Sequence, residues 1–137
     1  MKLDMDRPSL SGMTVVVVED DETLRTVLVA ILAEMGATCV AFGNAEDALI
    51  RLLESKGACS LMIVDHGVPG CIKGMEFISM VHEKWPGLPA ILTSGFQLDT
   101  STVAPPFSYL FKPWSIDELV ATIGRTLASA TYVHSAD

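Results

Sequence analysis

The sequence has few cysteines and no long apolar run, and each shortage excludes a class of protein. Its three cysteines, Cys39, Cys59 and Cys71, are odd in number and widely spaced, which argues against a disulfide framework and against a zinc site shared with the three histidines. No run approaches the ~18 apolar residues of a membrane span, and residues 1–10 lack the apolar core of a signal peptide. We therefore expect a protein of the reducing cytoplasm with no membrane insertion.

Positive charge is also scarce. The chain contains nine Lys and Arg residues and 17 Asp and Glu residues, which gives a net charge of −8 at pH 7. The basic residues are scattered along the sequence. Because no basic patch is available, we expect no nucleic-acid partner. The 137 residues, 50% of them hydrophobic, are enough for one domain around one core.

Short β-branched apolar runs alternate with apolar residues at helical spacing. The runs predict strands over residues 14–18, 38–42, 60–64, 89–93 and 109–111. The helical spacing predicts helices over about residues 24–35, 45–56, 75–84 and from 115 onward. Asn44 and the Ser115-x-x-Glu118 capping box mark two of the helix starts.

Strands that are apolar throughout and alternate with helices indicate a parallel sheet covered on both faces, which is a three-layer α/β sandwich. The segment 96–108 departs from this rhythm, because it occupies the place of a fourth helix but contains Pro105-Pro106 and three β-branched residues. We expect that helix to be short or degenerate, with one or two turns at most. The expected domain covers 13–128, between a flexible lead at 1–12 and a flexible tail at 129–137.

Polar side chains follow four of the five expected strands. Ligand sites of open parallel sheets lie beyond the carboxyl ends of the strands, so these residues are expected to meet at one rim. They are Glu19, Asp20, Asp65, Thr93, Ser94 and Lys112.

Carboxylates gathered at one rim repel each other by about 4 kcal/mol per pair at ~4 Å and an effective dielectric near 20. A divalent cation is one way to offset this, and a small oxygen-only ligand set favours Mg²⁺. An aspartate beside Mg²⁺, a hydroxyl and a lysine is suited to accept a phosphoryl group. Taken singly, each residue has a plainer explanation as a helix cap, a turn residue or a surface lysine; their coincidence at one rim favours a site.

Four ordered motifs carry a resemblance over about residues 13–128. They are VVVVEDD at 15–21, IVDHGVPG at 63–70, ILTSG at 91–95 and YLFKP at 109–113. In order and spacing, including a proline four residues after Asp65, they resemble the receiver domain of bacterial response regulators, similar to the chemotaxis regulator. The resemblance implies a flavodoxin-like fold with five parallel strands in the order 2-1-3-4-5.

The resemblance also implies the roles of the acidic residues. Asp65 would be the phosphoacceptor. Glu19, Asp20 and Asp65, together with the backbone carbonyl of Gly67, would bind Mg²⁺.

The remaining roles fall on the last two strands. Lys112 would pair with the phosphate, the Thr93 hydroxyl and the Ser94 backbone N–H would bind it, and Thr93 and Tyr109 would form the switch pair. The bond from Lys112 to Pro113 would be cis.

The implied function is that of a phosphoacceptor in a two-component or phosphorelay signalling system. The phosphoryl donor would be a sensor histidine kinase or a histidine phosphotransfer protein. The protein would not be an enzyme, since it would catalyse only its own phosphorylation and dephosphorylation. We expect its output to pass by contact with a downstream protein, and a homodimer stays open.

Some residues depart from the pattern of the receiver family. Gly74 lies nine residues after Asp65, one more than is common, and Gly67 and Gly95 replace side chains that affect phosphate lifetime in other members.

The main alternative function is that of a pseudo-receiver, an interaction module that is never phosphorylated. A haloacid dehalogenase phosphatase would need an aspartate at position 67, and an FMN-binding flavodoxin would need an anion nest in place of the acidic residues from Glu19 onward.

Overall fold

The computed structural model describes residues 8–136, with side chains as far as Ala130. The strands are β1 (Thr14–Val18), β2 (Thr38–Phe42), β3 (Leu61–Asp65), β4 (Ala90–Ser94) and β5 (Phe107–Phe111). The helices are α1 (Glu22–Glu34), α2 (Ala45–Glu54), α3 (Gly74–Lys84) and α4 (Ile116–Ala136). The predicted elements match these closely, except that β3 and β4 begin and end one residue later and β5 begins two residues earlier than expected.

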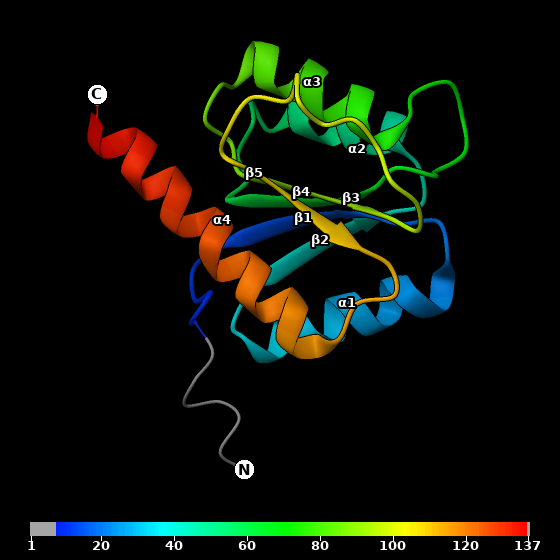
Figure 1. The fold of residues 1–137 in the computed structure, drawn as a ribbon, viewed down its shortest axis with the longest axis horizontal. Coiled ribbons are helices and arrows are strands. Elements are labelled where there is room, and N and C mark those ends of the chain that lie inside the picture. The colour runs from blue at the N-terminus through cyan, green and yellow to red at the C-terminus, as the bar shows by residue number, and fades with distance from the viewer. Residues whose placement is uncertain (1–7, 137) are drawn as a thin grey trace.

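The strands form one parallel sheet in the order β2-β1-β3-β4-β5, which confirms the predicted topology. Helices α2 and α3 cover one face of the sheet, and α1 and α4 cover the other (Figure 1). Every residue of β3 and of β4 is buried, because both strands lie inside the sheet and are covered on both faces. The expected three-layer α/β sandwich is therefore the observed architecture.

Side chains that accept hydrogen bonds from the first turn start three of the helices. Asp21 accepts from the N–H of Leu24 at 3.0 Å before α1, and Asn44 accepts from the N–H of Asp47 at 2.8 Å before α2. Before α4, the Ser115 hydroxyl accepts from the N–H of Glu118 while the Glu118 carboxylate accepts from the N–H of Ser115. This confirms the capping box. The cap after β1 turns the chain sharply and leaves the two preceding acids at the rim.

The described residues between β4 and β5, where a short or degenerate fourth helix was expected, form no helix. Between β4 and β5 the backbone forms bends and turns, and its apolar side chains Leu98 and Val103 pack on the core at the face covered by α2 and α3. The loop is the yellow segment that passes beside α3 in Figure 1. One hydrogen-bonded turn, from the Val103 N–H to the Thr100 carbonyl at 3.1 Å, forms in this loop, and Pro105 and Pro106, which lack backbone donors, prevent it from continuing as a helix toward β5.

The folded core extends beyond the expected domain at both ends. Leu10 is fully buried and its N–H donates to the carbonyl of Met35 at 2.8 Å, so part of the expected lead at 1–12 is packed against the body. Helix α4 continues past residue 128 to Ala136. Residues 1–7 and 137 lie outside the described residues. Within residues 8–136 no helix has the length and apolar character needed to cross a membrane.

Two glycines allow a matched test of packing at the start of α3. A Cβ on Gly74 would lie 2.6 Å from the carbonyl oxygen of Asp65, whereas a Cβ on Gly124, inside α4, would meet nothing within 4 Å. We expect Gly74→Ala to lower the free energy of unfolding by about 1–3 kcal/mol through overpacking. We expect Gly124→Ala to raise it by about 0.5–1 kcal/mol, because alanine is the better helix former. Urea titrations of both variants provide the measurement; equal effects would show that the close approach at Gly74 is relieved without cost.

Candidate functional site

Three carboxylates meet at the carboxyl end of the sheet. Glu19 and Asp20 follow β1 directly, Asp65 is the last residue of β3, and β1 and β3 are neighbours in the sheet. One oxygen from each of the three side chains lies within 4.8 Å of the others. Glu19 and Asp65 are 1% and 7% exposed, whereas Asp20 faces solvent. The cluster predicted from the sequence is therefore present, with two buried acids and one open to incoming ligands.

Lys112 provides the counter-charge for the buried pair. Its Nζ lies 2.9 Å from Oε1 of Glu19 and 3.2 Å from Oδ1 of Asp65. The residue follows β5, and its backbone N–H donates to the carbonyl of Ser94 at 2.8 Å, which fixes its place beside β4. The peptide bond from Lys112 to Pro113 is cis. One cation thus bridges acids from β1 and β3, which are far apart in the sequence.

Burial and ion pairing act in opposite directions on these groups. Burial raises the pKa of Glu19 above its usual value, and this outweighs the hydrogen bonds from Lys112 and the N–H of Asp21 that lower it. Burial lowers the pKa of Lys112, but the hydrogen bond to Glu19 and the charge of Asp65 outweigh burial and raise that pKa overall. The lysine therefore stays charged, and Glu19 carries a cost of desolvation that its hydrogen bonds do not fully offset.

The end of β4 completes the rim. Thr93 pairs with Asp65 in the β3–β4 register, and both Thr93 and Ser94 are 2% exposed. The Ser94 hydroxyl accepts from the N–H of Phe96 at 3.2 Å and donates to its carbonyl at 2.9 Å, which closes the turn after the strand. The hydroxyl of Tyr109, from β5, donates to the same Phe96 carbonyl at 2.5 Å. Thr93 lies at the acids, whereas Tyr109 contacts the loop that leaves the site.

The loop between β3 and α3 leaves the site and returns to it. A Cβ on Gly67 would lie 3.7 Å from Oδ2 of Asp65, so the backbone at this position passes close to the Asp65 carboxylate. At the far end the Gly74 N–H donates to the carbonyl of His66 at 3.2 Å. The imidazole Nδ1 of His66 accepts from the N–H of Met75 at 3.3 Å, in the first turn of α3.

Three residues that support the site were not singled out from the sequence. Arg25 donates to the Glu19 carbonyl at 2.8 Å, His66 holds the start of α3, and the Glu46 carboxylate binds two N–H groups of the β3–α3 loop. An acid in the first turn of α2 has an ordinary explanation through the helix dipole. Its contact with a loop 25 residues away leaves no mark in the local sequence pattern.

The acidic cluster fits a small divalent cation. Octahedral Mg²⁺ binds oxygens at about 2.1 Å, so two of its ligands lie at most about 4.2 Å apart. The observed separation of up to 4.8 Å requires only a small adjustment, and every ligand is an oxygen. Glu19, Asp20 and Asp65 are the side chains that could hold the ion, and the Gly67 backbone lies beside them.

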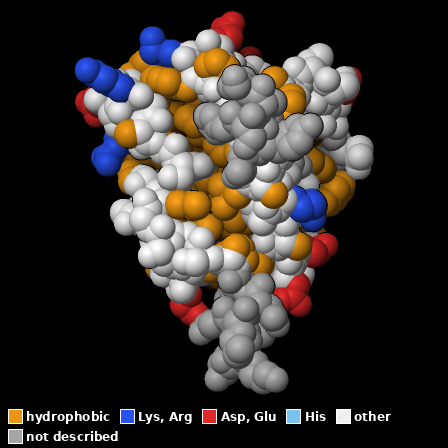
Figure 2. Space-filling view, turned by 90° about the vertical axis from the view of Figure 1, so that its left-hand side faces the viewer, with side chains coloured by type: hydrophobic (Ala, Val, Ile, Leu, Met, Phe, Trp, Pro, Cys, Tyr) orange, Lys and Arg blue, Asp and Glu red, His pale blue; other side chains and the backbone are white. Residues whose placement is uncertain are grey.

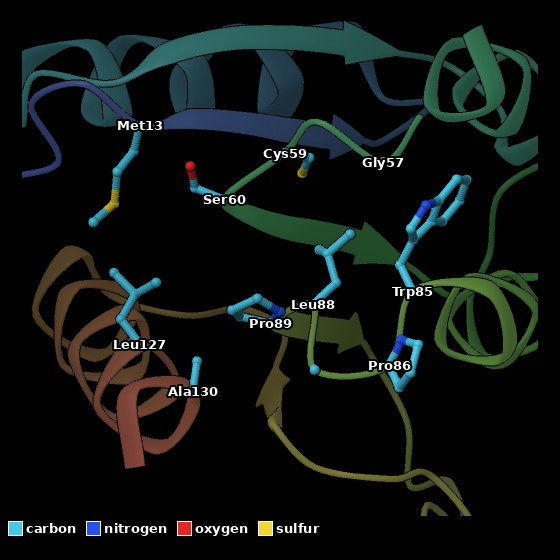
Figure 3. Close-up of a pocket in the computed structure, with 11 residues that line it drawn as sticks. Met13, Gly57, Cys59, Ser60, Trp85, Pro86, Leu88, Pro89, Leu127 and Ala130 are labelled. Atoms are coloured by element: carbon cyan, nitrogen blue, oxygen red, sulfur yellow. The ribbon is translucent and has the colours of Figure 1, made fainter. Parts of the chain in front are cut away.

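A second hollow, of about 340 Å³, lies at the opposite end of the sheet. It is lined by residues that precede β1, β3 and β4, by the turn after α3, and by α4 (Figure 3). Figure 2 shows this side of the molecule, where hydrophobic side chains gather between charged ones at the margins. The Cys59 thiol lines this hollow and donates to the Leu61 carbonyl, and burial raises the pKa of the thiol. No cluster of ionisable groups converges there within the described residues, so the acidic rim is the candidate site.

The family model for the response regulator receiver domain matches residues 15–124, and the chain belongs to this family. Among curated proteins, the DNA-binding transcriptional regulator NtrC of Escherichia coli K12 is 36% identical over 116 residues, and that of Salmonella typhimurium is 34% identical. Each alignment covers 82% of this chain and 24% of the relative. The chain therefore spans about a quarter of the length of these relatives.

Solved structures show the same fold at lower identity. A response regulator receiver domain protein from Clostridium thermocellum has a TM-score of 0.78 at 19% identity, and the match covers 88% of this chain and 98% of that one. NtrX from Brucella abortus, solved in complex with ADP, has a TM-score of 0.78 at 21% identity, with 90% of this chain and 29% of that chain covered. These likenesses confirm the predicted flavodoxin-like topology.

The Lys112 ion pairs can be tested through the pH dependence of stability. In Lys112→Met the carboxylates of Glu19 and Asp65 lose their cation, and the folded-state pKa of Glu19, which burial already raises, rises further above its unfolded value. The folded state then binds more protons than the unfolded state, so stability is kept at low pH and lost as the pH rises through the raised pKa of Glu19. Without Mg²⁺ we expect a loss of about 2 kcal/mol at pH 7.5, less than the ~3–5 kcal/mol of a fully buried pair because Lys112 is 23% exposed, and little loss near pH 4.

Urea titrations at a series of pH values measure this loss. Arg51→Met is the control, because it removes the same charge from an exposed position on α2. A loss in Lys112→Met that does not depend on pH would contradict the ion-pair explanation.

Proposed function

We propose that this receiver domain accepts a phosphoryl group on Asp65 in an Mg²⁺-dependent reaction, and that residues 13–128 carry this activity. The observation that carries the proposal is the placement of Asp65 between Lys112, 3.2 Å away, and the oxygens of Glu19 and Asp20. An acceptor carboxylate needs neighbouring cations to offset the charge of the incoming phosphoryl group. The donor would be the phosphohistidine of a sensor histidine kinase or of a histidine phosphotransfer protein.

In the proposed transfer, each bond that forms at phosphorus is matched by one that breaks. A carboxylate oxygen of Asp65 attacks phosphorus, the bond from phosphorus to the histidine nitrogen breaks, and that nitrogen leaves with the electron pair and takes up a proton. Bound Mg²⁺ would offset charge on the transferred group. Lys112 would shift from the Asp65 carboxylate to the phosphoryl oxygens, and the Ser94 backbone N–H would bind another. Water attack on the acyl phosphate would return Asp65 and release inorganic phosphate.

Thr93 and Tyr109 would pass the modification to a partner. The Thr93 hydroxyl has no hydrogen-bond partner within residues 8–136, so it is free to bind a phosphoryl oxygen. The Tyr109 ring packs against Phe111 and the core, and its hydroxyl donates to the Phe96 carbonyl, in a loop that contains no helix. Movement of Thr93 toward the phosphate would give the Tyr109 ring a second position and change the surface around Phe111. A downstream protein, or a second copy of the chain, would read this surface.

The cellular setting is proposed on the same grounds. All three cysteines are free in the structure, as expected in a reducing compartment such as the cytoplasm. The NtrC relatives are described as DNA-binding transcriptional regulators, and the matched quarter of their length is the receiver part. We propose that phosphorylation and protein contact, and not contact with nucleic acid, are the activities of residues 13–128.

The acceptor is tested directly by phosphorylation. Incubation of the chain with acetyl phosphate and Mg²⁺ should add one phosphoryl group, detected by mass spectrometry and lost in hydroxylamine. We expect Asp65→Asn to add none, because an amide nitrogen or oxygen is not a competent nucleophile. Asp99→Asn is the control, since Asp99 is an exposed acid in the β4–β5 loop. Labelling of Asp65→Asn would reject the acceptor, and no labelling of the wild type would favour a pseudo-receiver.

Metal binding is tested through Asp20. Asp20→Asn removes one ligand and one repelling charge, so we expect Mg²⁺ affinity to fall at least tenfold while the metal-free melting temperature stays the same or rises. For the wild type, Mg²⁺ at a hundredfold excess over Kd should stabilise the fold by about 2.7 kcal/mol. Calorimetric titration and thermal melts provide both numbers. A variant that melts lower without metal and binds Mg²⁺ normally would show that the acids are structural.

A further inference from the structure

We propose that Glu46 is a positioning residue for the metal site, because its carboxylate ties the β3–α3 loop, which carries Gly67, to helix α2. This inference rests on the proposed function, since it assigns a role in binding Mg²⁺ near Asp65. Nothing in the local sequence marks Glu46, and it lies on a helix that contributes no side chain to the acidic cluster.

The contact consists of two hydrogen bonds and one close approach. Oε2 of Glu46 accepts from the N–H of Cys71 at 2.8 Å and from the N–H of Ile72 at 3.2 Å. Gly70 adopts φ +102°, and a Cβ there would lie 2.6 Å from Oε1 of Glu46. The loop therefore turns tightly around the carboxylate, and we refer to the contacts of Glu46 with residues 70–72 as the loop clasp.

Charge strengthens the loop clasp. Hydrogen bonds from the N–H of Glu46 itself and from that of Cys71 hold the pKa of the Glu46 carboxyl below its usual value, and the charge of Lys73 acts in the same direction. The carboxylate is thus ionised at neutral pH, and hydrogen bonds that involve an ionised acceptor are stronger than neutral ones. The ionised carboxylate therefore strengthens the two hydrogen bonds of the loop clasp.

The rest of the loop is held by the buried side chain of Val68, by one lysine and at its end. Its end is closed by the hydrogen bond from Gly74 to His66, and Lys73 Nζ donates to the Val68 carbonyl at 2.9 Å. Residues 69–71 are exposed, and their conformations must be restricted to keep the loop in one arrangement beside Asp65. The loop clasp supplies this restriction from outside the loop.

The consequence is a dependence of metal affinity on a residue that never contacts the metal. Residues that orient the ligands of a metal change its affinity by about 10–100-fold when they are removed. Glu46→Ala should release the Cys71 and Ile72 N–H groups and let the Gly67 backbone move relative to Asp65. Glu46→Gln should keep most of the affinity, because its amide oxygen can accept the same two hydrogen bonds without the charge.

The first experiment uses the full chain and measures Mg²⁺ affinity by calorimetry, together with amide hydrogen exchange of Cys71 and Ile72. We expect Glu46→Ala to raise the Kd for Mg²⁺ about tenfold and to remove the protection of both amides. Glu46→Gln should stay within about threefold of the wild type. Glu54→Ala is the matched control, because it removes the same charge from an exposed position on α2 and should leave both readouts unchanged.

A second variant tests the loop clasp from the side of the loop. Gly70→Ala places a methyl group against Oε1 of Glu46 and should weaken Mg²⁺ binding with Glu46 still present. In Glu46→Ala/Gly70→Ala the two effects should be far from additive, because both act on one contact. Additive effects, or a Kd in Glu46→Ala equal to that in Glu54→Ala, would overturn the inference. If the wild type binds no Mg²⁺, the proposed function fails and the inference fails with it; normal wild-type binding with no effect of Glu46→Ala overturns the inference alone.

Discussion

Two carboxylates that share one lysine at the end of a buried sheet are the constraint on which the rest of the structure depends. Glu19 follows β1 and Asp65 ends the neighbouring strand β3, and both acids are buried, with exposures of 1% and 7%. The ammonium of Lys112 reaches both acids, and it offsets only part of their charge because it is itself one-quarter exposed. Two carboxylates and one ammonium leave the rim with an excess of negative charge, which would attract a cation.

The same constraint explains why the modification would have consequences beyond the rim. A phosphoryl group adds about −1.5 to −2 charges, more than Lys112 alone can balance. The groups that can respond are those without a fixed partner, and Thr93 is one of them. Tyr109 is next along the rim and is bound to a loop that consists of turns only. In the proposed function, the sheet would stay rigid while the β4–β5 loop moves, so that a local change of charge would change the surface near Tyr109.

The sequence was informative where one physical rule acts on neighbouring residues. Apolar β-branched runs, caps at Asn44 and Ser115, and polar residues directly after strands predicted the strands, the helix starts and the convergence of Glu19, Asp65 and Lys112. Parallel order makes all strand ends meet at one edge, so the site followed from the topology. The prediction of a short or degenerate fourth helix was also correct, since the segment between β4 and β5 forms bends and turns and no helix.

The features that could not be predicted are contacts between segments far apart in the sequence. Leu10 has no periodic partner, and only the folded chain shows that it packs beside Met35. Glu46 is an ordinary acid of a first helical turn until the β3–α3 loop folds back on it. Local patterns report which face of an element is buried, whereas a hydrogen bond from a loop depends on the path of the backbone.

The strands and the loops restrict the positions of the site residues to different degrees. The acids and the lysine occupy strand ends, where a shift of one residue would turn a side chain into the core, so their positions are strongly restricted. Gly67 lies on a loop whose length has no such limit. Such a loop is held by contacts from other elements, and Glu46 of α2 supplies two hydrogen bonds to it. The Glu46 carboxylate therefore links α2 to the loop that carries Gly67, although no side chain of α2 lies in the acidic cluster.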